Sequence, residues 1–455
     1  MYPKFLWLGI LFITFQSFSQ NNFRARILDG ETNRPLQGAN AVIKGTDIGD
    51  TADEEGLIEI NNISNGNQTV VFSYVGFETS EMTYKFPLSE DGIKTIYLYS
   101  AGEQMEAVFI NSTRSRRTIA DLPTRVEVIS GEELGEKGNM KPGDIRMLLN
   151  ETTGIQTQQT SATSYNSSIR IQGLDGKYTQ LLKDGYPLYS GFSGGLSLLQ
   201  IVPLDLKQVE VIKGASSTLY GGGAIAGLVN LVSKTPSEEE ELNLLLNGTS
   251  ALGLDASAFY SNKIGKLGTT VFASYNMGSP YDPSDIGLTA IPEFDRYTIN
   301  PRFFYYPNDD ATLDLGVNAV IEERVGGNID FIEGDNGVED PYFENNKTRR
   351  ITTRAGYEQS FENGSNLNIK NSLSFFERKI RIPDFVFSGD QFASFNEITY
   401  GFGERDSEWI AGVNLWVDSF KEDENPDSRG VDYEHLTYGA FLQHNWTVSD
   451  LLSLE

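Results

Sequence analysis

The chain has 455 residues, which is enough for several domains, and carries 36 basic and 63 acidic residues for a net charge of −27. Such acidity argues against binding to nucleic acid, because phosphates would repel the surface. Cysteine is absent, which excludes disulfides, thiolate metal sites and a lipid anchor on an N-terminal cysteine. With only His435 and His444 present, we expect no histidine-based metal site.

The N-terminus has the pattern of a secretory signal. A single basic residue, Lys4, precedes an apolar core at residues 5–15, and the small-residue pattern Ser17-Phe18-Ser19 follows. We therefore expect a signal peptide at residues 1–19, with an uncleaved anchor as the alternative. No later stretch approaches the ~18 apolar residues that a membrane helix needs. Because the chain has no cysteine for a lipid tether, export leaves a soluble protein or a β-barrel.

Residues 22–100 are predicted to form a small β-sandwich. Short runs of strand-forming residues are separated by turn pairs such as Asp29-Gly30 and Asn65-Gly66. The segment at residues 25–60 resembles a carboxypeptidase-regulatory-like domain. Since the region holds no candidate nucleophile or zinc-binding pair, we expect no peptidase activity from it.

Residues 101–118 form a polar linker that contains one short apolar run. This run is Glu106-Ala107-Val108-Phe109-Ile110, a β-prone segment. An extended segment in a flexible linker offers unpaired backbone groups to the sheet of a partner protein. The alternative is a linker strand that packs on its own domain.

Residues 119–236 show the patterns of a small α/β domain. At residues 122–134 a strand is followed by a helix start in which Ser130 can cap and Glu133 stands three residues on, a capping box. At residues 205–236 two apolar strand segments flank a turn that contains consecutive glycines. A phosphate-binding loop is excluded there, because no Lys-Ser or Lys-Thr pair closes the turn.

Several motifs in this region resemble the plug domain of TonB-dependent outer-membrane receptors. The matching segments are VEVIKG at 209–214, STLYG at 217–221, AIAGLVNL at 224–231 and the strand, turn and strand at 168–191. The resemblance implies that residues 119–236 are a plug and that the run Glu106 to Ile110 is a TonB box. Gln172 and Lys213 stand where the family usually has Arg. Plug-to-barrel salt bridges at these two positions therefore cannot be assumed.

Two polar segments of the plug lack periodicity, at residues 156–167 and 189–197. In the cobalamin and siderophore receptors that this plug resembles, the corresponding loops face the extracellular mouth and contact the substrate. The resemblance implies the substrate contacts Gln159, Tyr165, Asn166, Tyr189 and Phe192. The alternative is that these are solvated loop tips, because loops are generally polar whatever their role.

Residues 240–455 alternate apolar and polar side chains in segments of roughly ten residues, the signature of transmembrane β-strands. For example, Leu313, Leu315 and Val317 interleave with polar or small residues. A soluble sandwich could alternate likewise. Roughly ten or eleven strands are predicted, where plugged transporters close with about twenty-two, so we expect half of a barrel from a longer protein. The acidic loops at 322–345 and 422–434 match no calcium-binding spacing, and solvated loops are favoured over a metal site.

The predicted fold class is mainly β: an N-terminal sandwich, a small α/β plug and the first half of a transmembrane antiparallel barrel. The resemblance implies an energy-coupled importer in the outer membrane, with the sandwich in the periplasm and TonB as the partner of the box at Glu106 to Ile110. A ferric siderophore is the expected substrate; cobalamin, haem, copper and oligosaccharide stay open. A secreted adhesive or carbohydrate-binding protein is the alternative. We expect no resident cofactor and no enzymatic activity, because no histidine pair or elbow serine has a supporting context.

Overall fold

A computed structural model describes residues 21–30, 34–46, 48–75, 77, 79–88, 92–98, 126–161, 163, 166–188, 191–214, 220, 222–334, 337–404, 406–449 and 452–455. The chain divides into two compact units, Met1–Ala107 and Val108–Glu455. The predicted signal peptide and the run Glu106 to Ile110 lie outside the described residues. None of the helices in the described ranges is long and apolar enough to cross a bilayer.

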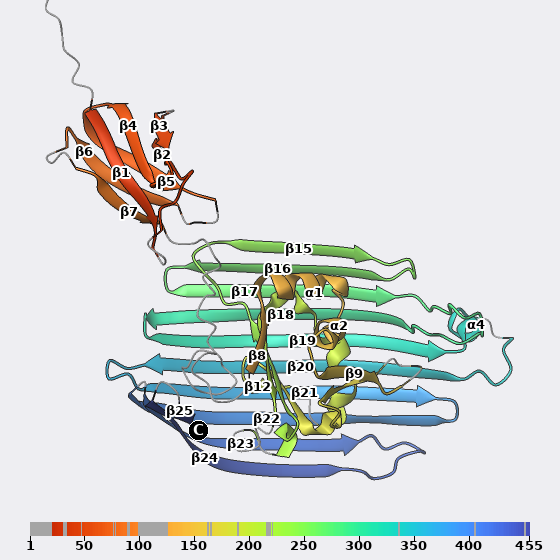
Figure 1. Cartoon of the computed structure of the whole chain (residues 1–455). Helices are drawn as coiled ribbons and strands as arrows, with labels where there is room; N and C mark the ends of the chain where they lie inside the picture. Colours follow the sequence, from red (N-terminus) through yellow and green to blue (C-terminus); the bar gives the residue numbers. More distant parts are fainter. Residues whose placement is uncertain are drawn as a thin grey trace, which may run out of the picture. The chain divides into compact units, whose positions relative to one another are not determined.

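The first unit is the predicted β-sandwich (Figure 1). Its strands are β1 (Asn21–Asp29), β2 (Asn40–Ile43), β3 (Gly49–Thr51), β4 (Leu57–Ile63), β5 (Gly66–Ser73), β6 (Ser80–Phe86) and β7 (Lys94–Leu98). They form one sheet of order β4-β1-β7 and a second of order β3-β2-β5-β6. On β1 the buried residues Phe23, Ala25 and Ile27 alternate with exposed ones, so one face of each strand contributes to a shared apolar core.

The second unit begins with the plug, which combines a mixed β-sheet with two short helices. Its regular elements are β8 (Val126–Ser130), α1 (Gly131–Met140), α2 (Arg146–Asn150), β9 (Ile155–Gln159), β10 (Ser167–Ile171), β11 (Thr179–Lys183), β12 (Tyr186–Pro187), β13 (Leu206–Lys213) and β14 (Gly227–Ser233). Short 3-10 segments are η2 (Gly176–Tyr178), η3 (Gly191–Gln200), η4 (Pro203–Asp205) and η5 (Gly222–Ala224). The main sheet has the order β12-β11-β14-β13-β8, and all seven residues of β14 are buried at its centre.

One local prediction about the plug is wrong. The strand and helix expected around Ser130 are present, and Ser130 occupies the N-cap position of α1. Among the described residues, however, its side chain makes no capping hydrogen bond. The first helical residue, Gly131, has a left-handed backbone with φ of 56°. This conformation turns the first amide groups of the helix away from the serine hydroxyl.

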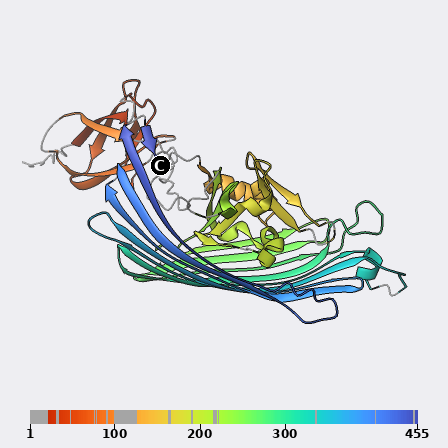
Figure 2. The same ribbon diagram turned by 90° about the horizontal axis from the view of Figure 1, so that it is seen from below.

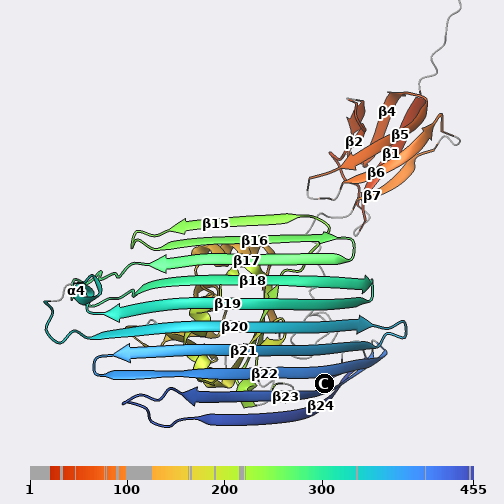
Figure 3. The ribbon, with the colours of Figure 1, turned by 180° about the vertical axis from the view of Figure 1, so that it is seen from behind.

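The rest of the second unit is one antiparallel sheet in strict sequence order, which we call the wall (Figure 3). Its strands are β15 (Glu241–Gly248), β16 (Leu254–Ile264), β17 (Leu267–Gly278), β18 (Glu293–Asn308), β19 (Ala311–Gly327), β20 (Phe343–Ser360), β21 (Asn366–Ile382), β22 (Phe385–Glu404), β23 (Ser407–Glu422), β24 (Tyr433–Ser449) and β25 (Leu452–Leu454). These eleven strands form an open sheet, not a closed barrel, within the described residues. A short helix, α4 (Ile329–Ile332), lies in the connection between β19 and β20.

The two faces of the wall have inverted polarity. On β18 the inward side chains Arg296, Asn300 and Arg302 are buried, whereas the outward side chains Ile299 and Phe303 are 49% and 62% exposed. A sheet of a soluble protein buries its apolar face against a core, so exposed apolar residues on this scale suit contact with lipid. Glu322, expected in a loop, lies inward on β19 and is 2% exposed; the strand continues past it to Gly327.

The plug lies on the concave, inward face of the wall (Figure 2). Close approach depends on glycine at Gly356, where a Cβ atom would lie 2.8 Å from the hydroxyl of Tyr186 on the plug. The Tyr186 hydroxyl donates a hydrogen bond to the Ala355 carbonyl at 3.1 Å. A larger side chain at position 356 would therefore force the Tyr186 hydroxyl away from its place against β20.

Candidate functional site

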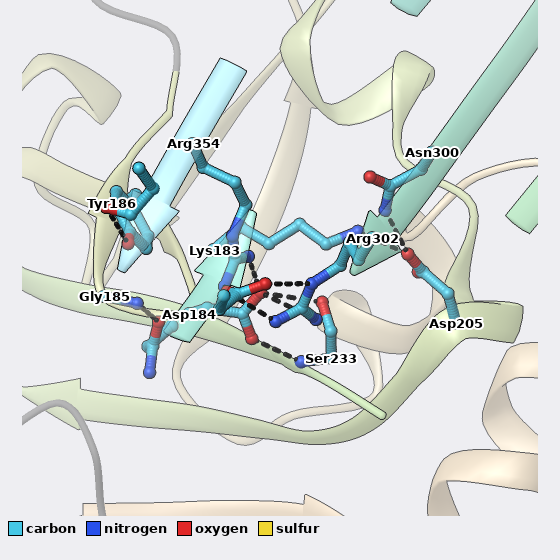
Figure 4. Close-up of polar contacts among 12 residues, drawn as sticks. Lys183, Asp184, Gly185, Tyr186, Asp205, Ser233, Asn300, Arg302 and Arg354 are labelled. Atoms are coloured by element: carbon cyan, nitrogen blue, oxygen red, sulfur yellow. Dashed lines mark hydrogen bonds and ion pairs between the residues drawn. The ribbon is translucent and has the colours of Figure 1, made fainter. Parts of the chain in front are cut away.

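The contact between plug and wall, which we call the seam, is centred on four charged residues. Asp184 belongs to the plug, in the turn between β11 and β12, while Arg302, Asp314 and Arg354 point inward from β18, β19 and β20. In the register of the wall, Arg302 and Arg354 are both paired with Gly316. Because glycine has no side chain, the two guanidinium groups can extend across this position toward Asp184 (Figure 4).

Carboxylates and guanidinium groups alternate within this charge network. Arg354 makes ion pairs with both Asp184 and Asp314. Arg302 Nη2 lies 3.0 Å from Asp314 Oδ2, and Arg302 Nη1 lies 3.6 Å from Asp184 Oδ2. The side chains are 4% to 15% exposed. Two positive and two negative charges thus neutralise one another in a region where an unpaired charge would be costly.

Asp184 is ionised in this setting. Burial alone would raise its pKa, but the positive charges of Arg354, Arg302 and Lys183 outweigh burial and hold the pKa of the carboxyl well below its usual range. Asp184 also accepts hydrogen bonds from the Ser233 amide at 2.7 Å and from the Ser233 hydroxyl at 2.9 Å. The carboxylate is therefore fixed by the plug on one side and by the wall on the other.

The turn that presents Asp184 is itself held by buried polar groups. Asp184 has a left-handed backbone with φ of 54°, which Asp tolerates better than most residues. The amide of Gly185 donates to Asn230 Oδ1 at 3.0 Å, and Asn230 Nδ2 donates to Glu210 Oε2 at 3.0 Å. Because Asn230 and Glu210 are fully buried in β14 and β13, the turn is anchored to the centre of the plug sheet.

A second ion pair lies beside the network. Lys183 Nζ is 2.6 Å from Asp205 Oδ2, and Asn300 on β18 donates to the same oxygen at 3.1 Å. Figure 4 shows Lys183 next to Asp184, and Asp205 beside Asn300 on the other side of Arg302. Asp205 is 2% exposed, so this contact also links plug to wall without reaching solvent.

Elsewhere along the seam, wall side chains bind the plug backbone. Arg296 is 2% exposed and donates to the carbonyl oxygens of Leu199 and Gly143. Arg350 Nη2 donates to the Ser193 carbonyl at 3.0 Å, while Gln391 Oε1 accepts from the Ser193 amide at 2.8 Å. These bonds satisfy backbone groups of η3 at Ser193 and Leu199 and of the α1–α2 connection at Gly143.

Of the predicted substrate contacts, Gln159, Asn166 and Phe192 lie among the described residues, whereas Tyr165 and Tyr189 lie outside them. Gln159 is exposed and its side chain donates to the Ser161 carbonyl at 2.7 Å. Asn166 lies close by in the same β9–β10 hairpin, where its carbonyl accepts from the Thr160 amide.

Phe192 lies in η3, apart from Gln159 and Asn166, and packs against the wall. Its ring centroid is 4.6 Å from that of Phe420, 5.5 Å from Phe387 and 5.8 Å from Phe376. This side chain therefore anchors the plug to the inward aromatic residues of β21–β23. Its contact with a substrate stays a prediction, as do those of the other four residues.

The two positions where the family usually has Arg do not form the link to the wall. Lys213 makes its ion pair with Glu127 of β8, inside the plug. Gln172 adopts a left-handed turn with φ of 51°, and its amide donates to the Gly154 carbonyl at 2.8 Å. The charge network around Asp184 was missed, although the Lys183-Asp184-Gly185 turn and the inward arginines on alternating strands were visible in the sequence.

The acidic loop at 422–434 uses its carboxylates for turn formation. Glu422 accepts backbone hydrogen bonds from Arg429 at 3.0 Å and from Val431 at 3.2 Å. In the part of the chain that the structure describes, no three His, Asp or Glu side chains gather as ligands for a metal ion.

Two family models match the chain. One, the TonB-dependent receptor plug domain, matches residues 118–228, and the other, the CarboxypepD_reg-like domain, matches residues 24–110. The vitamin B12 transporter BtuB of Vibrio vulnificus is 30% identical over 156 residues, which are 34% of this chain and 25% of that protein. The ferric aerobactin receptor of Klebsiella pneumoniae is 32% identical over 136 residues, 30% of this chain and 18% of that receptor.

Solved structures share the fold of the second unit. The siderophore receptor PirA from Acinetobacter baumannii superposes with a TM-score of 0.56 at 18% identity, covering 71% of this chain and 55% of that receptor. The chain thus spans a quarter or less of the length of these curated relatives and about half of this solved receptor.

Proposed function

Because the chain carries the plug domain of TonB-dependent receptors against a wall with the fold of those receptors, we propose that it forms part of an energy-coupled transporter of the outer membrane. The observation that carries this proposal is the seam, where paired charges and backbone hydrogen bonds attach a folded plug to the wall. The opposite face of the wall exposes apolar side chains, which suits contact with lipid. TonB-dependent receptors are not enzymes, and we assign no enzymatic activity to the chain.

The proposed substrate is a ferric siderophore. It is supported by the 32% identity over 136 residues to a ferric aerobactin receptor. Cobalamin is the second candidate, supported by the 30% identity to a vitamin B12 transporter. The two assignments are separated with a strain that lacks the receptor carrying this chain. Its uptake of iron-55 siderophore complexes and of labelled cobalamin is measured. Loss of iron uptake alone is expected, and loss of cobalamin uptake alone would overturn the siderophore assignment.

The proposed contact with TonB is the run Glu106-Ala107-Val108-Phe109-Ile110, which would add a strand to the partner's sheet from the periplasmic side. Its place between the sandwich and the plug suits a segment that must reach a periplasmic protein. Deleting these residues is expected to abolish uptake and to leave substrate binding intact. Uptake at an unchanged rate would show that Glu106 to Ile110 is not the TonB contact. The transporter assignment would not be affected.

The outer-membrane location is also a proposal, with the sandwich on the periplasmic side. It is supported by the exposed apolar residues on the outward face of the wall. Heat-modifiable electrophoretic migration of the receptor in the outer-membrane fraction is expected. Migration that does not change on heating would favour a soluble adhesive protein instead.

A further inference from the structure

A cavity of about 70 Å3 lies in the seam next to the charge network. The plug contributes the β11–β12 hairpin and residues 200–205, and the wall contributes inward residues of β17 to β21. Since one water occupies roughly 10–15 Å3 on this measure, the cavity has room for about five waters or for a small organic molecule.

Three buried side chains that line the cavity have an unused polar atom. These are Gln200 Oε1, Asp205 Oδ1 and Thr298 Oγ1, which lack a hydrogen-bond partner among the described residues. The residues are 2%, 2% and 7% exposed. Buried polar atoms are normally hydrogen-bonded, so these three atoms favour a polar molecule as the partner inside the cavity.

The same side chains are held in place by their other atoms. Gln200 Nε2 donates to Thr348 Oγ1 at 3.0 Å, and Asp205 Oδ2 is bound by Lys183 and Asn300. The unused oxygens are therefore fixed in position. Arg354 adds an unused donor, its Nε atom, while its terminal nitrogens bind Asp184 and Asp314.

The chemistry of these atoms selects the occupant. Gln200 Oε1 and Asp205 Oδ1 need a donor, which a fully deprotonated anion such as sulfate cannot provide, and Arg354 Nε needs an acceptor, which a bare cation cannot provide. The charges of Lys183 and Arg354 are already paired, so a charged occupant would leave one charge uncompensated. A neutral hydroxyl group both donates and accepts, and the apolar side chains of Leu188 and Phe272 suit its carbon skeleton.

We propose that the cavity is a binding site for a neutral, hydroxyl-bearing solute such as a small polyol, with water as the other source of the same O–H chemistry. An occupant contacts the plug hairpin and the wall at once, and so adds a bridge beside Asp184. The site is separate from the β9–β10 hairpin with Gln159 and Asn166. It goes beyond the uptake function and does not depend on which solute is imported.

These 455 residues contain no cysteine, which makes a direct test available. In the receptor that carries this chain, with any cysteine outside these residues replaced by serine, Ser372→Cys places a single thiol in the lining of the cavity, where Ser372 is 7% exposed and not one of the residues with an unused atom. Its rate of modification is measured with hydroxyethyl, sulfonatoethyl and trimethylammonioethyl methanethiosulfonate. Each rate is divided by that of Ser237→Cys, an exposed control.

The normalised rate of the neutral hydroxyethyl reagent is expected to exceed both charged rates by at least about tenfold, because burying an unpaired charge is unfavourable. Xylitol is expected to slow modification at Ser372→Cys and to leave Ser237→Cys unaffected. Adding Thr298→Val, which removes one of the unused oxygens, should abolish this protection.

Equal normalised rates for the three reagents, or protection that persists with Thr298→Val, would overturn the proposal. Modification only after unfolding would show that water alone enters, and would overturn the solute site as well. Unchanged heat-modifiable migration controls for folding, and Asn318→Cys, on another part of the lining, replaces Ser372→Cys if that variant misfolds.

Discussion

The interior of the plug and the seam between plug and wall are both buried, but they are built from different chemistry. The plug interior is built mainly from aliphatic side chains such as Val209, Val229 and Leu231, all fully buried. The seam also has apolar packing, such as Phe192 against Phe420, but it adds buried ion pairs around Asp184 and wall side chains bonded to the plug backbone. Apolar contacts hold the plug together as one body, whereas polar groups at the seam can exchange their partners for water.

This difference suits a plug that moves while it stays folded. Separating an apolar interface exposes hydrocarbon to water at roughly 25 cal/mol per Å2 of apolar area. Separating a polar interface exposes groups that water can hydrogen-bond, so the net contribution of each bond is only about 0.5–1.5 kcal/mol. A force applied to the plug should therefore break the seam before it unfolds the sheet.

The largest effect is expected from Asp184→Asn. The substitution keeps the shape of the side chain but leaves Arg302 and Arg354 with Asp314 as their only carboxylate in the network. Removing one partner of a buried ion pair costs on the order of 3–5 kcal/mol. The loss should appear as release of a folded plug, measured by protease access to the seam at rising urea concentration.

Asp285→Asn is the matched control for this variant. Asp285 has the same left-handed backbone, with φ of 53° against 54° for Asp184, and lies exposed in a loop of the wall. The control should leave the urea midpoint unchanged. If Asp184→Asn behaves like Asp285→Asn, the charge network does not hold the plug.

Leu231→Ala tests the other side of the comparison. Leu231 is fully buried in β14 at the centre of the plug sheet, and truncation of such a residue costs roughly 2–5 kcal/mol through lost transfer energy and a cavity. Here the plug itself should lose protection, measured by hydrogen exchange of β13 and β14 amides. Exchange confined to the seam would contradict the division between core and seam.

The strands were predictable and the network was not, for a physical reason. Apolar residues such as Leu313 and Leu315 share the outward face and alternate with inward ones, so period-two alternation identified β19 directly. Alternation says which face a residue occupies but not which residue lies opposite on the next strand. The position of Gly316 between Arg302 and Arg354 depends on how β18, β19 and β20 are paired. No local sequence pattern encodes this register.

The same limit explains the gaps at the site. The motif around Lys213 left a salt bridge to the barrel in doubt, and its partner is in fact Glu127 on a neighbouring plug strand. Phe192 could be assigned to a polar loop, but its packing against Phe420 depends on how plug and wall dock. Contacts between bodies far apart in sequence are set by tertiary structure.

The pH dependence of the seam is a smaller effect that sharpens the comparison. The folded pKa of Asp184 lies below its unfolded value of about 3.9. Its stabilising contribution is therefore fully present above about pH 4 and is lost as the pH falls through the folded pKa. The urea midpoint should differ between the unmodified receptor and Asp184→Asn from neutral pH down to about pH 4, and the two should converge only below it. Convergence already at pH 6 would contradict an ionised, paired carboxylate.

The smallest effect is expected from an ion pair of similar length at the loop end of the outward face, four residues from the end of β19 at Gly327 and from the start of β20 at Phe343. Lys347 Nζ lies 2.8 Å from Glu323 Oε1, close to the 3.0 Å between Arg302 and Asp314, but its side chains are 57% and 49% exposed. An exposed pair contributes only about 0.2–1 kcal/mol, because water screens the charges and two long side chains must be ordered. Lys347→Gln should therefore shift the urea midpoint by no more than a small fraction of the Asp184→Asn shift, and high salt should remove even that. A shift as large as that of Asp184→Asn would mean that burial does not explain the stabilising contribution of the seam ion pairs.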